Sequence, residues 1–120
     1  MSMSRLGADV PLLAVVVPDT TATDMRLVGE LDLATVPVLT TLIEQQIATG
    51  HLDVHIELSE LAFCDVRGLR GLLDGHRRLA AAGGQLTLTA PRPLLTRVAV
   101  LIGVAAELGW LLEPAPARTD

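Results

Sequence analysis

The side chains that could do chemistry in this 120-residue chain stand where apolar runs give way to helical patterns. Asp65 follows an apolar run and precedes a helical pattern, so its carboxylate can accept the amide of Arg67 or Gly68 as a helix N-cap. Thr35 marks an earlier helix start, with its hydroxyl as the cap. Asp32, just before it, either contacts a partner or caps that first helix from the loop. The chemistry that these side chains can do is hydrogen bonding to free backbone amides at the start of a helix.

Arg67 is an unusual residue for the first turn of a helix. A cation there opposes the helix macrodipole by a few tenths of a kcal/mol to about 1 kcal/mol. Two explanations are open: a partner's carboxylate compensates, or the arginine is solvated and reaches Asp32 or Asp65.

The helix that follows Asp65 carries a stripe of small residues and a charged face. Gly68, Gly71 and Gly75 either admit a partner's backbone or pack against a neighbouring element of this domain, which we favour. The charged residues, which have i,i+4 spacing typical of a solvated face, are Arg70, Asp74, Arg77 and Arg78.

The remaining reactive side chains do not form a catalytic or metal-binding pattern. His51 and His55 are four apart on a turn and a strand, a spacing that separates them, and no Cys or carboxylate cluster completes a zinc site. His76 lies among leucines and is expected to be packed or to lie at the boundary of the core, and Cys64 is expected to be a small buried hydrophobe. No nucleophile with a nearby base and no phosphate-binding glycine loop is evident. We expect that this protein is not an enzyme and that it binds neither a cofactor nor a metal ion.

Composition limits the class of protein further. Half of the residues are hydrophobic, which suits one compact domain. A net charge of -5 and only 2% aromatic residues disfavour nucleic-acid binding. The single cysteine excludes an internal disulfide, and neither a signal peptide nor a membrane-spanning segment is recognised, so we expect a cytoplasmic protein.

Periodicity predicts the elements that position these residues. Strands are expected at residues 12–17, 25–29, 54–58, 85–89 and 108–112, the first two as an antiparallel pair. Helices are expected at residues 35–50, 65–82 and 93–103. The last helix is expected to bury Leu94, Leu95, Val98, Leu101 and Ile102. Alternating strands and helices imply an α/β fold with a mixed, partly parallel sheet and covering helices. Residues 10–112 would form this domain, between flexible ends at 1–9 and 113–120.

The run at residues 58–69 resembles the signature of STAS domains, the family of sulfate transporters and anti-sigma-factor antagonists. In that family a strand is followed by an aspartate, a phosphorylatable serine or threonine, a small polar residue, and then Gly-Leu or Gly-Ile. Asp65 and Gly68 match, but the acceptor position holds Val66. Three further segments match in order: Gly-Glu-Leu-Asp at 29–32, Gly-Gly at 83–84, and residues 91–103 as the last helix. We expect a single STAS-like domain.

The resemblance implies a non-enzymatic module that binds a kinase-type anti-sigma factor and thereby frees a sigma factor, with phosphorylation breaking that complex. Val66 has no oxygen to receive a phosphoryl group, so we expect binding without phosphorylation at this site. The nearest hydroxyls in the sequence are Ser59 and Thr35. The partner surface implied by the resemblance comprises Asp32, Thr35, Asp65, Val66, Arg67, Gly68 and Leu69.

Two other functions are compatible with the sequence. The chain could be a STAS scaffold or accessory subunit of a stress-signalling assembly or of a lipid-transport ATPase. It could also be a small-ligand sensor with a crevice near Asp32 and Asp65. The sequence leaves the partner's identity and a homodimeric state open.

Overall fold

A mixed sheet runs through the molecule, which is described by a computed structural model over residues 12–19 and 21–112. The strands are β1 (Leu13–Pro18), β2 (Ala22–Leu31), β3 (Asp53–Glu57), β4 (Leu61–Cys64) and β5 (Gln85–Thr89). β1 and β2 form the predicted antiparallel pair, whereas β3 pairs parallel with both β2 and β5. The order is β1-β2-β3-β5, and β4 pairs in parallel with the end of β2. The predicted mixed α/β fold is confirmed.

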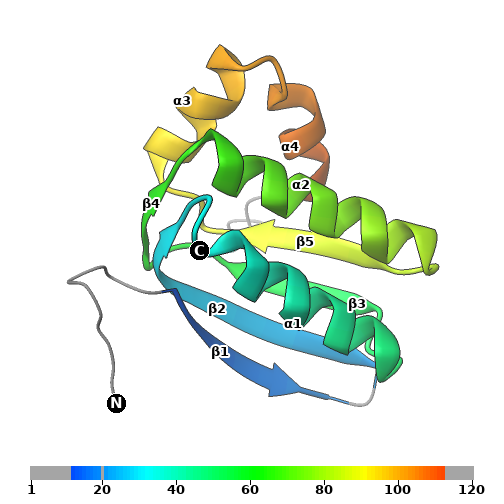
Figure 1. Cartoon of the computed structure of the whole chain (residues 1–120). Helices are drawn as coiled ribbons and strands as arrows, with labels where there is room; N and C mark the ends of the chain where they lie inside the picture. Colours follow the sequence, from blue (N-terminus) through cyan, green and yellow to red (C-terminus); the bar gives the residue numbers. More distant parts are fainter. Residues whose placement is uncertain (1–11, 20, 113–120) are drawn as a thin grey trace, which may run out of the picture.

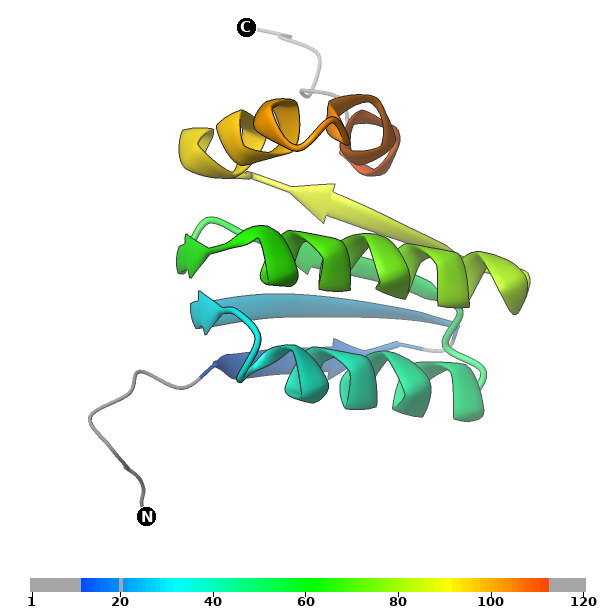
Figure 2. The same cartoon turned by 45° about the horizontal axis from the view of Figure 1, so that its top comes forward.

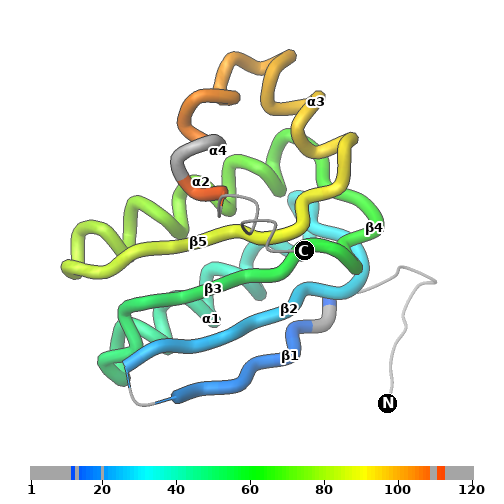
Figure 3. Tube along the Cα trace, turned by 180° about the vertical axis from the view of Figure 1, so that it is seen from behind, coloured from blue at the N-terminus to red at the C-terminus, as the bar shows by residue number. Residues whose placement is uncertain are grey.

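Two pairs of helices accompany the sheet. The helices are α1 (Val36–Ala48), α2 (Val66–Ala81), α3 (Pro93–Leu101) and α4 (Ala105–Leu111). α1 and α2 lie side by side over one face, while α3 and α4 lie beyond β5 (Figures 1 and 2). Seen from behind, the strands β1, β2 and β3 face the viewer without a described helix over them (Figure 3). The helices α1 and α2 both begin at the end of the sheet where β2 and β4 end (Figure 2).

The core lies between the sheet and these two helices. β2 alternates along its length, and Leu27 and Leu31 on its inner face are fully buried. α1 contributes Leu39 and Ile43. α2 contributes Leu69, Leu72, Leu73 and Leu79. Burying such side chains provides roughly 1.5–3 kcal/mol each, so the hydrophobic face of each helix fixes its position on the sheet.

Two predicted strands differ from the structure, and one strand was not predicted. β2 extends past residue 29 to Leu31, with a register shift at Gly29, and β4 is a strand that periodicity missed. Residues 108–112 were expected to be a strand, but they fall mostly in α4, and only Leu112 forms an isolated bridge with Leu88. The segment at 105–108, Ala-Ala-Glu-Leu, is rich in helix formers, which explains the helix.

The buried face of α3 is also narrower than predicted. Leu95 is buried as expected, and Val98 and Ile102 are half-buried against the core. Leu94 is exposed, however, and Leu101 is 83% exposed. Ala99, four residues after Leu95, completes the buried stripe instead. Because α3 packs along one narrow stripe, leucines on its other side remain in solvent.

Two further expectations concern membrane-spanning segments and the two ends of the chain. In the described part of the chain, no helix has the length and apolarity needed to cross a membrane. The ends expected to be flexible, residues 1–9 and 113–120, lie outside the described residues.

Candidate protein-interaction site

The start of α2 is built as the sequence predicts. Asp65 is the N-cap in extended conformation (φ -91°, ψ -172°), and its Oδ1 accepts a hydrogen bond from the Gly68 amide at 2.8 Å. The Asp65 amide donates to the Leu31 carbonyl at 3.3 Å, which ties the cap to the end of β2. Val66 is therefore the first residue of α2.

The turn before α1 is held by a second set of hydrogen bonds. The Asp32 carboxylate accepts from the amides of Ala34 (2.9 Å) and Thr35 (3.1 Å). The Thr35 hydroxyl accepts from the Asp32 amide at 2.9 Å and donates to the Glu30 carbonyl at 2.8 Å. Thr35 holds the N-cap position of α1, but its side chain makes no capping hydrogen bond into the helix, contrary to prediction. Its hydroxyl is already engaged within the turn.

Glycines on α2, which have no side chain, allow the starts of α1 and α2 to lie close together. A Cβ atom on Gly68 would lie 2.2 Å from the Leu31 carbonyl oxygen, and one on Gly71 would lie 3.0 Å from Val36. The favoured explanation of the glycine stripe, packing within the domain, is confirmed. Gly68 and the neighbouring Leu69 are buried, so they can shape the predicted partner surface but offer it little area.

Exposed apolar side chains gather around this junction. Val66 is 37% exposed, Phe63 at the end of β4 is 42% exposed, and Leu33 in the turn before α1 is 63% exposed. Val38 in the first turn of α1 is exposed as well. We call these four residues, with the exposed Arg67, the helix-start surface. A cluster of exposed apolar residues is typical of protein-interaction sites.

Sequence reasoning missed Leu33, Val38 and Phe63. Phe63 offered a signal, because it is one of only two aromatic residues and lies inside the motif at residues 58–69. Leu33 and Val38 come from segments distant in sequence. Only the parallel pairing of β4 with β2 brings them to the same end of the sheet as α2.

Charges divide α2 into two halves. In its second half, Arg78 pairs with Asp74 at 2.8 Å, the predicted i,i+4 contact, and with Glu44 of α1 at 2.7 Å. Arg77 pairs with Glu107 of α4. Arg67 forms no ion pair with any described residue, and reaches neither Asp32 nor Asp65. Its guanidinium is left to solvent or to a partner's carboxylate.

The other candidate residues are accounted for locally. His51 contacts the Thr49 hydroxyl at 2.8 Å and His55 contacts Asp53 at 3.1 Å, so the two histidines are engaged separately. No group of three or more potential metal ligands occurs among the described residues. Cys64 is buried, as predicted, and burial raises the pKa of its thiol to about 12.

The comparison with known families agrees with this architecture. Residues 16–113 match the family model described as the Mlab STAS domain. The chain belongs to the STAS domain family. This match confirms the family resemblance read from the sequence. No curated protein matches the chain.

Solved structures of STAS proteins share the fold. An anti-sigma factor antagonist from Mycobacterium paratuberculosis superposes with a TM-score of 0.71 at 24% identity, covering 92% of each chain. Bacillus SpoIIAA in its phosphorylated form gives 0.66 at 26% identity, over 87% of this chain and 92% of SpoIIAA. The unphosphorylated SpoIIAA gives 0.69 at 24% identity, over 87% and 89%. This STAS chain therefore resembles anti-sigma factor antagonists, whose fold is generally that of a non-enzymatic regulatory domain.

Proposed function

We propose that this STAS domain is a non-enzymatic antagonist that binds a kinase-type anti-sigma factor through the helix-start surface. The observation that carries the proposal is the position of Val66. It is exposed, it is the first residue of α2, and it directly follows the Asp65 cap. Exposed apolar residues also occur at the end of β4 and at the start of α1. We assign the function to a domain at residues 10–112.

The local physics explains what a phosphate would do at this position. The first amides of a helix have no intrahelical acceptor, and together with the macrodipole they favour an anion. A phosphorylated side chain at residue 66 would add a charge of about -2 to an apolar surface and disrupt contacts there. Valine cannot accept a phosphoryl group, so the helix-start surface stays apolar, and binding is controlled by the amount of protein or by another signal.

A second candidate function is an accessory subunit of a larger assembly, such as a lipid-transport ATPase. The description of the matching family model leaves room for a function outside sigma-factor control, because it names Mlab and not an anti-sigma factor antagonist. Both functions use a protein partner and are compatible with the helix-start surface. Affinity capture from the native host followed by mass spectrometry separates them by the partner's identity.

The substitution Val66→Glu tests the surface itself. It introduces a carboxylate where a phosphate would sit, and a buried interface charge without a partner costs several kcal/mol, so affinity should fall about a hundredfold or more. Isothermal titration calorimetry with the captured partner measures the change. Val17→Glu is the matched control, because Val17 is an exposed valine on β1 that pairs with the beginning of β2, whereas α2 starts at the other end of β2.

The fold of the Val66→Glu variant is checked by circular dichroism before titration. Arg67 could pair with the new carboxylate and reduce the loss, so Arg67→Ala in the same background should deepen it. An unchanged affinity in a folded Val66→Glu variant would show that the helix-start surface does not bind the partner, and the antagonist function would be rejected.

A further inference from the structure

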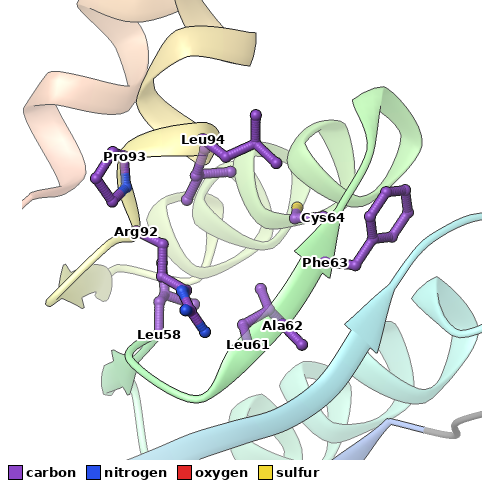
Figure 4. A pocket seen from close by; sticks show the side chains of 9 residues that line it. Leu58, Leu61, Ala62, Phe63, Cys64, Arg92, Pro93 and Leu94 are labelled. Carbon is purple, nitrogen blue, oxygen red and sulfur yellow. The ribbon is translucent and has the colours of Figure 1, made fainter.

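A pocket opens between β4 and the start of α3, next to the helix-start surface. It has a volume of about 230 Å³. Leu61, Ala62 and Cys64 line it on the β4 side, and Leu94 and Arg92 face them from α3 and the residue before it (Figure 4). The remaining lining residues are Leu58, Phe63, Pro93 and Leu95. Since Cys64 directly precedes the Asp65 cap, the pocket and the start of α2 share one edge of the molecule.

The size of the pocket favours a protein side chain as its occupant. Sites for drug-sized molecules usually measure about 300–1,000 Å³, and this pocket is smaller. Protein interfaces, in contrast, commonly seat single anchor side chains in small, well-packed apolar pockets. Most of the lining residues are aliphatic, so an aliphatic anchor matches the pocket best.

The charge of the pocket lining indicates which chemical group should accompany the aliphatic side chain. Arg92 is the only charged residue among those that line the pocket. Its side chain is exposed and forms no ion pair with the described residues, so its guanidinium is available to a partner. An acidic group beside the apolar anchor would complement this arginine.

We propose that this pocket receives one aliphatic side chain of the partner protein, with an adjacent carboxylate of that partner bound by Arg92. The proposal rests on the proposed function, because it extends the helix-start surface across β4 to α3. The partner would thus contact α2 through Val66 and α3 through Leu94 on the two sides of β4.

The pocket can be tested without the partner. The full chain, labelled with ¹⁵N, is titrated with N-acetyl-leucine, which carries an aliphatic side chain and a carboxylate. We expect millimolar binding, with amide shifts at Ala62, Cys64 and Leu95. N-acetyl-leucinamide, which lacks the carboxylate, should bind up to about fivefold more weakly, as expected for the loss of one exposed ion pair. N-acetyl-alanine, which lacks three carbon atoms of the leucine side chain, should bind about tenfold more weakly or worse, as expected for the loss of most of one apolar contact.

Variants identify the groups responsible. Arg92→Ala should remove the preference for N-acetyl-leucine over its amide, and Leu94→Ala should weaken both probes. Leu101→Ala is the matched control, because Leu101 is an exposed leucine of the same helix that does not line the pocket, and it should bind like the wild type. Equal responses to all three probes, or shifts elsewhere, would overturn the proposal. Tighter, saturable binding of octanoate at the same amides, without a response to N-acetyl-leucine, would assign the pocket to a lipid and overturn it as well.

Calorimetry with the captured partner separates this proposal from the proposed function. We expect Leu94→Ala and Arg92→Ala each to weaken binding about tenfold, within the range of interface alanine substitutions. If Val66→Glu weakens binding while both of these variants bind normally, the pocket assignment is wrong and the antagonist function stands. If Val66→Glu has no effect, the function itself is wrong.

Discussion

Gly68 determines how closely the first turn of α2 approaches the end of β2. The Leu31 carbonyl, which lies where a Cβ atom of residue 68 would be, also accepts the Asp65 amide. One missing side chain therefore allows both the close packing and the hydrogen bond that position the cap. This is a steric requirement, and it gives the glycine of the family motif a physical reason in this chain.

Gly68→Ala should destabilise the protein, whereas Gly75→Ala should not. The added methyl group at residue 68 meets backbone, which cannot move without shifting β2 or α2, so we expect a loss of about 2 kcal/mol or more. At residue 75 the nearest atom lies 3.5 Å away on the Ile43 side chain. There, replacing a glycine inside a helix should be neutral or stabilise by up to about 1 kcal/mol. Urea denaturation measures both, and similar losses in the two variants would contradict this steric account.

Cys64 gives the protein an unusual dependence on alkaline pH. The chain contains neither tyrosine nor lysine, so few other side chains titrate between about pH 9 and 12. Burial, with the Asp65 carboxylate adding to it, raises the pKa of the native thiol to about 12. The unfolded thiol, with a pKa near 8.5, loses its proton first as the pH rises, which stabilises the unfolded state.

We therefore expect the free energy of unfolding to be highest below about pH 8.5 and to fall above it, by up to about 1.4 kcal/mol per pH unit, until the native thiol titrates. Urea denaturation under reducing conditions at several alkaline pH values measures the fall. In Cys64→Ala the decline should disappear. A decline of equal slope in that variant would mean that another group is responsible.

At the scale of elements, α1 is fixed to the sheet by a buried polar contact as well as by its leucine and isoleucine side chains. The Thr23 hydroxyl of β2 donates to Oε1 of Gln46 at 2.6 Å, and both residues are buried. Neither residue follows from hydrophobic periodicity, which marks only apolar positions. The contact sets the end of α1 that lies farthest from the helix-start surface.

Removing one partner of this contact should cost more than replacing both. Gln46→Ala leaves the Thr23 hydroxyl buried without its partner, and we expect a loss of about 1–3 kcal/mol. The double variant Thr23→Val with Gln46→Leu replaces the pair by apolar groups of similar shape and should recover most of that loss. Thermal and urea unfolding of the single and double variants test the coupling. Additive losses would show that the hydrogen bond contributes little.

The elements themselves were predictable where local sequence determines them. The start of α2 follows from Asp65 and the periodicity after it, and the structure agrees. β4 escaped prediction because four residues give too short an alternation, and its burial is irregular. α4 was taken for a strand because apolar residues alone do not distinguish the two. In the candidate site, the cap could be predicted, but the exposure of Leu33 and Phe63 depends on tertiary packing.

At the scale of the whole molecule, the proposed partner surface occupies one end of the sheet. The ends of β2 and β4 and the starts of α1, α2 and α3 converge there (Figures 1 and 2). Exposed apolar residues and the arginines Arg67 and Arg92, which lack described ion pairs, lie at this end, in a chain with a net charge of -5. In the second half of α2, Arg77 and Arg78 are paired with acidic residues of the neighbouring helices α4 and α1. This contrast favours a partner with acidic and apolar residues.

The absence of a hydroxyl at residue 66 determines how the proposed complex with an anti-sigma factor would be regulated. Incubation of the wild type with a cognate anti-sigma kinase and ATP should give no phosphate at residues 65–69 and no loss of binding. Val66→Ser should fold normally, because serine suits the first turn of a helix and residue 66 is partly exposed. If the kinase still recognises this surface, the variant should become phosphorylated and lose affinity by about a hundredfold through the added charge. Mass spectrometry locates the phosphate, and calorimetry measures the affinity before and after ATP.

Two hydroxyls provide the internal comparison. Thr35 is engaged by the Asp32 amide and the Glu30 carbonyl, so it should remain unmodified, whereas Ser59 is exposed between β3 and β4 and contacts only Glu57. Stoichiometric phosphate on either residue of the wild type would show that regulation has moved to a new hydroxyl, and binding independent of phosphorylation would be abandoned. A Val66→Ser protein that binds the kinase but is never phosphorylated would show that the contact surface has diverged together with the acceptor.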